Sequence, residues 1–266
     1  MSVPQPAEIL VHRLDGSLAA VDSVGRSRGQ AAALLGIVGL LTVAATLALA
    51  SQAALGIGFV AFAPLTFAAI AALVLVNLPS HGARRFGPAN AVTSLRAGMT
   101  AIVGGLAVDA SHWAEPDGWL AWTAAGLALA NLSLDGIDGW LARRTDLASR
   151  FGARYDMEID ALLILFLSVL AFQLGKAGAF VWLIGLLRYG FWLAGKVWPV
   201  LDGQLAPSRF RKAVCVVQIV VLCALAVPPV VPPLSPVLAA FALALLCASF
   251  GRDIVSLLTR PTRATA

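Results

Sequence analysis

The sequence predicts an all-α integral membrane protein, and three observations support this fold class. Hydrophobic residues make up 59% of the 266 residues and charged residues only 12%, whereas about 25% charged residues is usual in globular domains. Apolar runs of roughly 20 residues, the length of a helix that crosses a bilayer, recur along the chain. The runs show no alternation of period 2, so helices are the expected way to pair the backbone within lipid.

Glycine, proline and charged residues divide the apolar sequence into eight expected spans. The stretches between them are too short to fold as a separate soluble domain. The polar segment 1–30 lacks the short apolar stretch and cleavage site of a signal peptide, and we expect it to be a retained cytoplasmic tail. The spans cover approximately residues 31–50, 55–76, 89–109, 118–143, 155–174, 179–200, 212–227 and 236–258.

The placement of lysine and arginine predicts the orientation of these spans. If the N-terminus is inside, the predicted outer segments hold a single basic residue, Lys176, and the other basic residues between spans lie inside. Both termini are therefore expected in the cytoplasm, with the protein in the cell (inner) membrane. The basic residues are spread over short loops and form no face with interleaved aromatics, so a nucleic-acid partner is not expected.

One short region is far more charged than the rest. Residues 135–160 hold ten of the 33 charged side chains. On helices, Asp135 and Asp138 are three residues apart and Asp156 and Asp160 are four apart, so each pair shares a helix face. Because the linker between the two helices is short, we expect antiparallel neighbours whose four carboxylates converge on the cytoplasmic side.

Four converging carboxylates predict a metal site. Each acid near the membrane interior costs roughly 2.5–3.5 kcal/mol by insertion scales, and mutual repulsion adds to this cost unless cations intervene. Carboxylate oxygens favour Mg²⁺ or Mn²⁺, and four of them can hold two ions about 3.5–4 Å apart, an arrangement that typically acts on phosphates. Ion pairs with nearby arginines would explain one isolated acid more simply than four at these spacings. Those arginines are Arg143, Arg144, Arg150 and Arg154.

The region resembles the signature of the CDP-alcohol phosphatidyltransferases, D-x-x-D-G-x-x-A-R-x8-G-x3-D-x3-D. All eight fixed positions and every gap match. A second motif, N-x-x-T-x-x-R, is similar to the start of the first core helix of that family and begins here at Asn90. The resemblance covers about residues 88–258 and implies a six-helix catalytic core in residues 81–266, preceded by two extra transmembrane helices in residues 31–80. The signature positions are Asp135, Asp138, Gly139, Ala142, Arg143, Gly152, Asp156 and Asp160.

The resemblance also implies roles for individual residues. Asp135, Asp138 and Asp156 would bind two divalent cations, Mg²⁺ or Mn²⁺, and Asp160 would contact metal and act as general base toward the acceptor hydroxyl. The implied partners are CDP-diacylglycerol or a related CDP-alcohol, a polar alcohol and the surrounding lipids. Residues implied to line the CDP site are Asn90, Thr93, Gly139, Ala142, Arg143 and Gly152.

The identity of the acceptor alcohol is left open by the sequence. If Arg154, Arg188 and one basic residue of the cluster at 209–212 converge, we expect an acceptor that carries a phosphate, as glycerol 3-phosphate and inositol phosphate do. The alternatives are that Arg188 is partnered by a buried carboxylate or by carbonyls and that the cluster at 209–212 only anchors orientation. Transfer of a CDP-linked head group to a lipid alcohol is also compatible with the signature. The candidate acceptor-binding residues are Arg154, Arg188, Arg209, Arg211 and Lys212.

Two other functional classes are alternatives to this one. A UbiA-like prenyltransferase also uses acid pairs and Mg²⁺, but its N-D-x-x-D-x-x-x-D motif is missing from the segment around Asp135. A cation transporter would place polar residues or broken helices at the midplane of several spans. For the two extra spans, three roles remain open: a lipid-facing brace, a contact in a homodimer, or a docking element.

Overall fold

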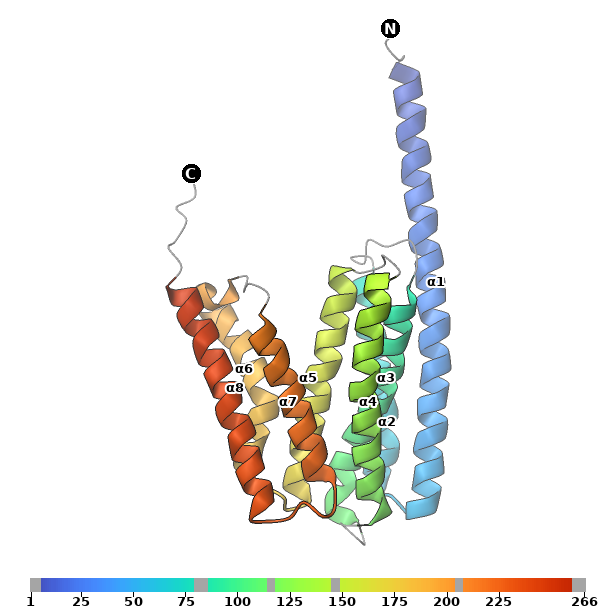
Figure 1. The fold of residues 1–266 in the computed structure, drawn as a ribbon. Helices are drawn as coiled ribbons and strands as arrows, with labels where there is room; N and C mark the ends of the chain where they lie inside the picture. Colours follow the sequence, from blue (N-terminus) through green and yellow to red (C-terminus); the bar gives the residue numbers. More distant parts are fainter. Residues whose placement is uncertain (1–5, 79–85, 114–117, 145–148, 204–207, 260–266) are drawn as a thin grey trace.

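The computed structural model describes residues 6–78, 86–113, 118–144, 149–203 and 208–259, with the side chains of residues 6–26, 140, 142, 143, 150 and 202 outside this description. Within these ranges the chain forms eight α-helices and no strand, as predicted (Figure 1). The helices are α1 (Pro6–Ala53), α2 (Ile57–Asn77), α3 (Pro88–Asp109), α4 (Trp119–Arg144), α5 (Arg150–Gln173), α6 (Trp182–Val197), α7 (Arg209–Ala226) and α8 (Leu234–Leu258).

The protein is an all-α integral membrane protein. Among the described residues, six helical segments are long and apolar enough to cross a membrane: Ser27–Ala53, Ile57–Asn77, Pro88–His112, Trp119–Gly139, Ala179–Val197 and Leu234–Leu258. The sequence predicts spans at α5 and α7 as well. Both helices are apolar over most of their length, but each begins with several charged residues, including Asp156, Glu158 and Asp160 in α5.

The first helix is longer than the sequence predicts. The expected span begins at residue 31, whereas α1 is a single helix from Pro6, and its apolar part begins at Ser27. Figure 1 shows the N-terminal part of α1 extending beyond the ends of the other helices. The expected tail is therefore largely helical, because no proline or paired glycines interrupt the chain between Pro6 and Ala53.

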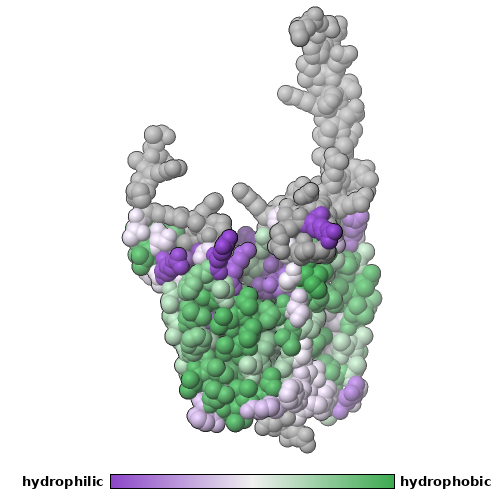
Figure 2. Space-filling model, in the orientation of Figure 1, coloured by the Kyte–Doolittle hydropathy of each residue, from purple (hydrophilic) through white to green (hydrophobic). Residues whose placement is uncertain are grey.

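The start of α1 and the end of α8 lie at the same end of the bundle, together with the end of α4 and the start of α5 (Figure 1). The turns between α1 and α2, α5 and α6, and α7 and α8 lie at the opposite end. Figure 2 shows a hydrophobic flank, with hydrophilic residues gathered most strongly at the end that carries the termini. This distribution is typical of a multi-pass membrane protein.

Helix α3 is the centre of the bundle. Of its most apolar window, 72% is buried, against 22–33% for the other five candidate spans. Small residues allow its neighbours to approach closely. A Cβ atom at Gly104 would lie 2.6 Å from the Phe166 ring of α5, and one at Gly98 would lie 2.6 Å from Thr42 Oγ1 of α1. Glycine at these positions is therefore required by close packing.

The two N-terminal helices pack directly on α3. Phe59 and Phe67 of α2 are buried, and a Cβ at Gly105 of α3 would lie 2.9 Å from the Phe59 ring. Phe59 belongs to the same apolar core as buried residues of α3, α4, α5, α7 and α8. Of the three open roles, this packing favours a brace, since α1 and α2 complete the burial of the central helix.

The end of the bundle far from the termini holds two buried charged groups, each bound to a backbone group. Asp109 ends α3, and its Oδ2 accepts a hydrogen bond of 3.3 Å from the Gly56 amide between α1 and α2. Lys176, in the turn after α5, donates a bond of 3.0 Å from Nζ to the Pro228 carbonyl in the turn after α7. These bonds connect successive turns of the bundle.

Candidate active site

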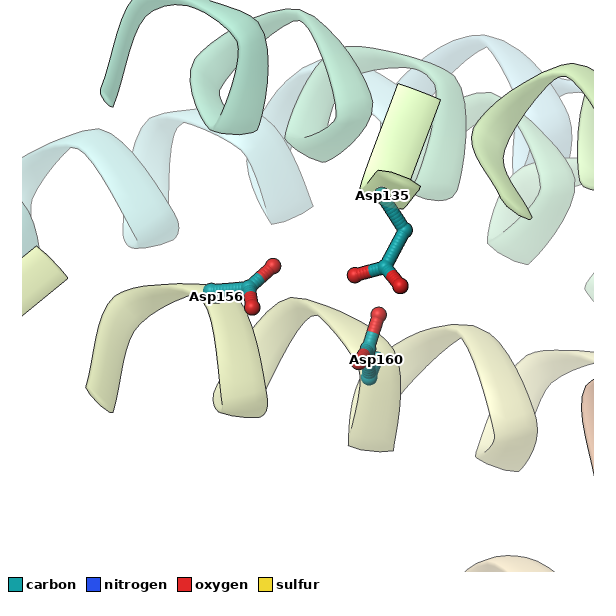
Figure 3. Close-up of side chains that lie close together, drawn as sticks. All are labelled: Asp135, Asp156 and Asp160. Atoms are coloured by element: carbon teal, nitrogen blue, oxygen red, sulfur yellow. The ribbon is translucent and has the colours of Figure 1, made fainter. Parts of the chain in front are cut away.

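Three of the predicted metal ligands meet between two helices. Asp135 projects from α4 and Asp156 and Asp160 project from α5, and each offers an oxygen that lies within 4.8 Å of the others (Figure 3). All three are partly exposed, with side-chain exposures of 30%, 34% and 16%. These acids therefore converge, as their helical spacing predicts.

The start of α5 fixes the register of its two acids. Ser149 is the N-cap, and its hydroxyl accepts a hydrogen bond of 3.0 Å from the Gly152 amide. Asp156 and Asp160 then follow one turn apart on the same face. The acids consequently lie about two to three turns inside the helix, in the half of the bundle nearest the termini.

Helices α4 and α5 are antiparallel, as predicted, but they are not close neighbours along their length. Among the described residues they share few direct contacts, and each packs extensively on α3 and also on α7. The acids therefore converge beside α3 and not across a direct α4–α5 interface. This difference explains why a side chain of α3 can lie among them.

That side chain is Arg96, which is completely buried. Its Nη1 lies 3.1 Å from Asp135 and 2.7 Å from Asp138, and also contacts Asp156, while its Nη2 contacts Asp160. One guanidinium thus faces all four carboxylates. Since an arginine remains protonated in proteins, it partly compensates the cluster but leaves an excess of negative charge.

Asn131, on α4, holds Arg96 in this position. Its Oδ1 accepts a bond of 3.0 Å from Arg96 Nε, and its Nδ2 donates to the Arg96 carbonyl at 2.9 Å and to Thr100 Oγ1 at 2.8 Å. Asn131 is fully buried and lies one turn before Asp135 on the same face. The guanidinium is therefore oriented from the side opposite to the carboxylates.

Asp138 occupies the innermost position of the four acids. Its side chain is 4% exposed, and besides Arg96 it lies 3.3 Å from Thr93 Oγ1. The Thr93 hydroxyl also lies 3.1 Å from the Ala89 carbonyl, so its single proton can be donated to either oxygen. The cluster of oxygens that could hold a metal ion is formed by the three outer acids without Asp138.

Two of the predicted CDP-site residues lie against each other. A Cβ at Gly152 would lie 2.8 Å from Asn90 Oδ1, so glycine allows the first turn of α5 to approach the first turn of α3. Thr93 follows Asn90 by one turn, and Gly139 of α4 is half-buried next to Asp138. Ala142 and Arg143 lie in α4, but their side chains fall outside the described part of the chain.

Two of the five candidate acceptor-binding residues form ion pairs with acids. Arg188 of α6 lies 2.9 Å from Glu158 of α5, so this arginine is paired with a carboxylate, but neither side chain is buried. Arg211 of α7 lies 2.9 Å from Asp253 of α8. The other three candidates, Arg154, Arg209 and Lys212, are exposed.

The donor set fits a divalent cation. Three carboxylate oxygens lie close together, and hard oxygen ligands of this kind suit Mg²⁺ or Mn²⁺. The excess of negative charge around Arg96 gives the cluster a further reason to attract cations. The residues that would hold the metal are Asp135, Asp156 and Asp160, with Asp138 directly behind them.

Arg96 and Asn131 are two residues of the site that the sequence does not predict as such. Arg96 is the last position of the N-x-x-T-x-x-R motif, and its charge in an apolar span is a usable signal, because such residues face the bundle interior and meet an anion. Asn131 offered a weaker signal: it is a polar residue within an apolar run, four positions before Asp135.

A model of the CDP-alcohol phosphatidyltransferase family matches residues 86–249, which is more than half of the chain. The matched segment begins just before α3 and ends within α8, so it contains the whole acidic cluster and leaves out α1 and α2. Comparisons with curated proteins and with solved structures gave no match.

Proposed function

Because the chain belongs to the CDP-alcohol phosphatidyltransferase family, we propose that it transfers the phosphatidyl group of CDP-diacylglycerol to the hydroxyl of a polar alcohol and releases CMP. The family itself implies transfer from a CDP-alcohol to an alcohol in the membrane. The donor, the acceptor and a role in phospholipid synthesis are the proposed part. The protein would work in the cell membrane, with its termini and its active site on the cytoplasmic side.

The convergence of Asp135, Asp156 and Asp160 is the observation that carries this proposal. It brings three signature positions from two helices into one cluster of oxygens. The cluster lies eight to ten residues from the ends of the helices that carry Arg96, Asp135 and Asp160, which is roughly 12–15 Å along a helix axis. A lipid donor and a water-soluble acceptor can both reach this depth.

The proposed chemistry is a displacement at phosphorus. The acceptor oxygen forms a bond to the phosphatidyl phosphorus, the bond from that phosphorus to the CMP oxygen breaks, and CMP leaves with the bonding electrons. Asp160 accepts the proton of the attacking hydroxyl as general base. Divalent cations bound by the carboxylates would neutralise the pyrophosphate and the leaving group.

Other residues of the chain would position the nucleotide. Asn90 and Gly152 are in contact at the start of α3 and α5, and Thr93 lies one turn further along α3. Gly139 follows Asp138 directly and has no side chain to obstruct a ligand. Together with Ala142 and Arg143 they form the proposed CDP site.

We assign a phosphorylated acceptor, such as glycerol 3-phosphate or inositol phosphate, to the proposed reaction. Arg188 would reach the acceptor phosphate only by leaving Glu158, which lies two residues from Asp156 and from Asp160 and therefore on the opposite face of α5. An incoming phosphate would compete with Glu158 for the guanidinium. Arg154, Arg209, Arg211 and Lys212 supply further positive charge at the starts of α5 and α7.

The decisive experiment is an activity assay of the purified protein in detergent or vesicles. CDP-diacylglycerol and Mg²⁺ or Mn²⁺ are supplied with glycerol 3-phosphate, inositol phosphate, free inositol, serine and choline in turn. CMP release and a new phospholipid are expected with a phosphorylated acceptor. Turnover with the unphosphorylated alcohols alone would exclude the phosphorylated acceptor while retaining the reaction.

A second arm of the assay tests the direction of transfer. CDP-choline or CDP-ethanolamine is supplied with diacylglycerol, and we expect no product. Binding of CDP with a divalent cation, measured by calorimetry, is expected in either direction of transfer. A protein that binds neither CDP nor CMP in the presence of metal would contradict the proposed function as a whole.

A further inference from the structure

The arginine among the catalytic acids has the same partners that a metal would have. Asp135, Asp156 and Asp160 are the three carboxylates whose oxygens cluster. Each of them is also in contact with the guanidinium of Arg96. A divalent cation and Arg96 would therefore bind the same carboxylates.

We infer that Arg96 is a resident counter-cation that competes with divalent metal for this cluster, and that it thereby sets the metal affinity of the site. The inference rests on the proposed function, because it assumes that the cluster binds metal. It concerns a residue whose role is positioning and electrostatic, and it assigns Arg96 no step in the chemistry.

Burial makes the competition strong. Arg96 is fully buried and Asp160 is 16% exposed, so water screens their interaction poorly. Without a cation, these partly buried acids would repel one another and would destabilise the bundle. Arg96 provides a compensating charge that is part of the chain itself.

Arg96 also has contacts outside the three outer acids, and these would hold it in place when a metal binds those acids. Asn131 binds its Nε and its carbonyl from α4. Asp138, which lies outside the outer cluster of oxygens, binds Nη1 at 2.7 Å. The guanidinium can thus yield the outer carboxylates to a metal and still have hydrogen-bond partners.

Competition predicts opposite effects on the metal-free and metal-bound protein. Replacing Arg96 by methionine, which has a similar length and no charge, should lower the unfolding midpoint in EDTA. The same change should tighten Mn²⁺ binding roughly tenfold, within the usual range of coupling between two sites. The shift of the midpoint on adding Mn²⁺ should therefore be larger than in the wild-type protein.

The test uses the full-length protein in detergent, with Mn²⁺ alone as the probe. Free Mn²⁺ is measured by electron paramagnetic resonance, and unfolding is followed by tryptophan fluorescence. Arg252→Met is the matched control, because Arg252 stacks on Phe210 at 5.4 Å, away from the acids. The control should bind Mn²⁺ as the wild-type protein does.

Arg96→Lys keeps the inference testable if Arg96→Met does not fold in EDTA. Lysine retains the charge but not the planar fork of the guanidinium. We therefore expect Arg96→Lys to bind Mn²⁺ about threefold more tightly than the wild-type protein, with an affinity between those of the wild-type protein and Arg96→Met. Unchanged or weaker Mn²⁺ binding in the folded Arg96 variants would overturn the inference. Absence of Mn²⁺ binding in the wild-type protein would instead overturn the proposed metal site.

Discussion

Charged side chains inside the helical bundle have different partners at its two ends. At the end far from the termini, Asp109 is bound by a backbone amide and Lys176 by a backbone carbonyl, and each bond connects two turns. In the half nearest the termini, four carboxylates surround one arginine. Charge at the first end is matched to local backbone groups, whereas charge at the second exceeds what packing requires.

This difference separates structural from functional charge. A buried ionisable group that serves packing needs only enough partners to offset its desolvation. An unbalanced cluster raises the free energy of the folded protein, and its retention indicates a ligand that supplies the missing charge. The comparison can be tested by changing one group at a time at each end.

The largest effect is expected for Asp160→Asn. Loss of the proposed base should reduce transfer by a factor of about 10²–10⁴, the usual contribution of general base catalysis. The matched control is Asp109→Asn, which changes the same residue type at the other end and should leave transfer unchanged. CMP release is the measurement, and equal unfolding midpoints would establish that both variants fold. Full activity of Asp160→Asn would exclude Asp160 as the general base.

Asn131→Leu should have the next largest effect. The change leaves Arg96 Nε and Thr100 without their buried partner, which typically costs about 1–3 kcal/mol. The free energy of unfolding in EDTA should fall by that amount, measured in a mild detergent with added denaturing detergent. An unchanged free energy would mean that Arg96 is held by the carboxylates alone.

Gly98→Ala tests the middle of α3, between the two ends. The new methyl group would lie 2.6 Å from Thr42 Oγ1 and 3.2 Å from Val38, and overpacking of this kind costs about 1–3 kcal/mol. Gly126→Ala is the control, because no atom lies within 4 Å of a Cβ there. Thermal unfolding should separate the two variants, and an equally stable pair would show that α1 can move away from α3.

The smallest effect is expected for Lys176→Met. Its bond to the Pro228 carbonyl connects two turns, and a typical hydrogen bond contributes about 1 kcal/mol net, so the loss of this bond should cost about that amount. Transfer and Mn²⁺ affinity should remain at wild-type values. A fall in activity without a fall in stability would contradict the division between the two ends.

The fold and much of the site can be predicted from the sequence, because local patterns determine them. Apolar runs bounded by glycine, proline and charge mark the eight helices, and the pairs Asp135 with Asp138 and Asp156 with Asp160 share faces by helical periodicity alone. The position of Arg96 among the acids cannot be predicted from such local patterns. It depends on α3 lying beside both acid-bearing helices, and no spacing within one helix contains that information.

Side-chain contacts between different helices cannot be predicted from spacing along the chain, for the same reason. Arg188 has no acid at helical spacing within α6, and its partner Glu158 lies 30 residues earlier on α5. The helical start of α1 is not predicted by apolar runs because its sequence is polar, although no proline between Pro6 and Ser27 would stop a helix. The family signature adds roles for the acids, but it does not describe which cation faces them.

The packing of α2 on Gly105 bears on how this protein can be shortened. A truncated chain beginning near residue 81 would keep the region matched by the family model. It would also expose to lipid the glycine-lined face of α3 that Phe59 and Thr42 now cover, and the helix that carries Arg96 would lose its outer support. Engineering of a minimal enzyme from this chain should therefore begin by redesigning that face with larger apolar side chains.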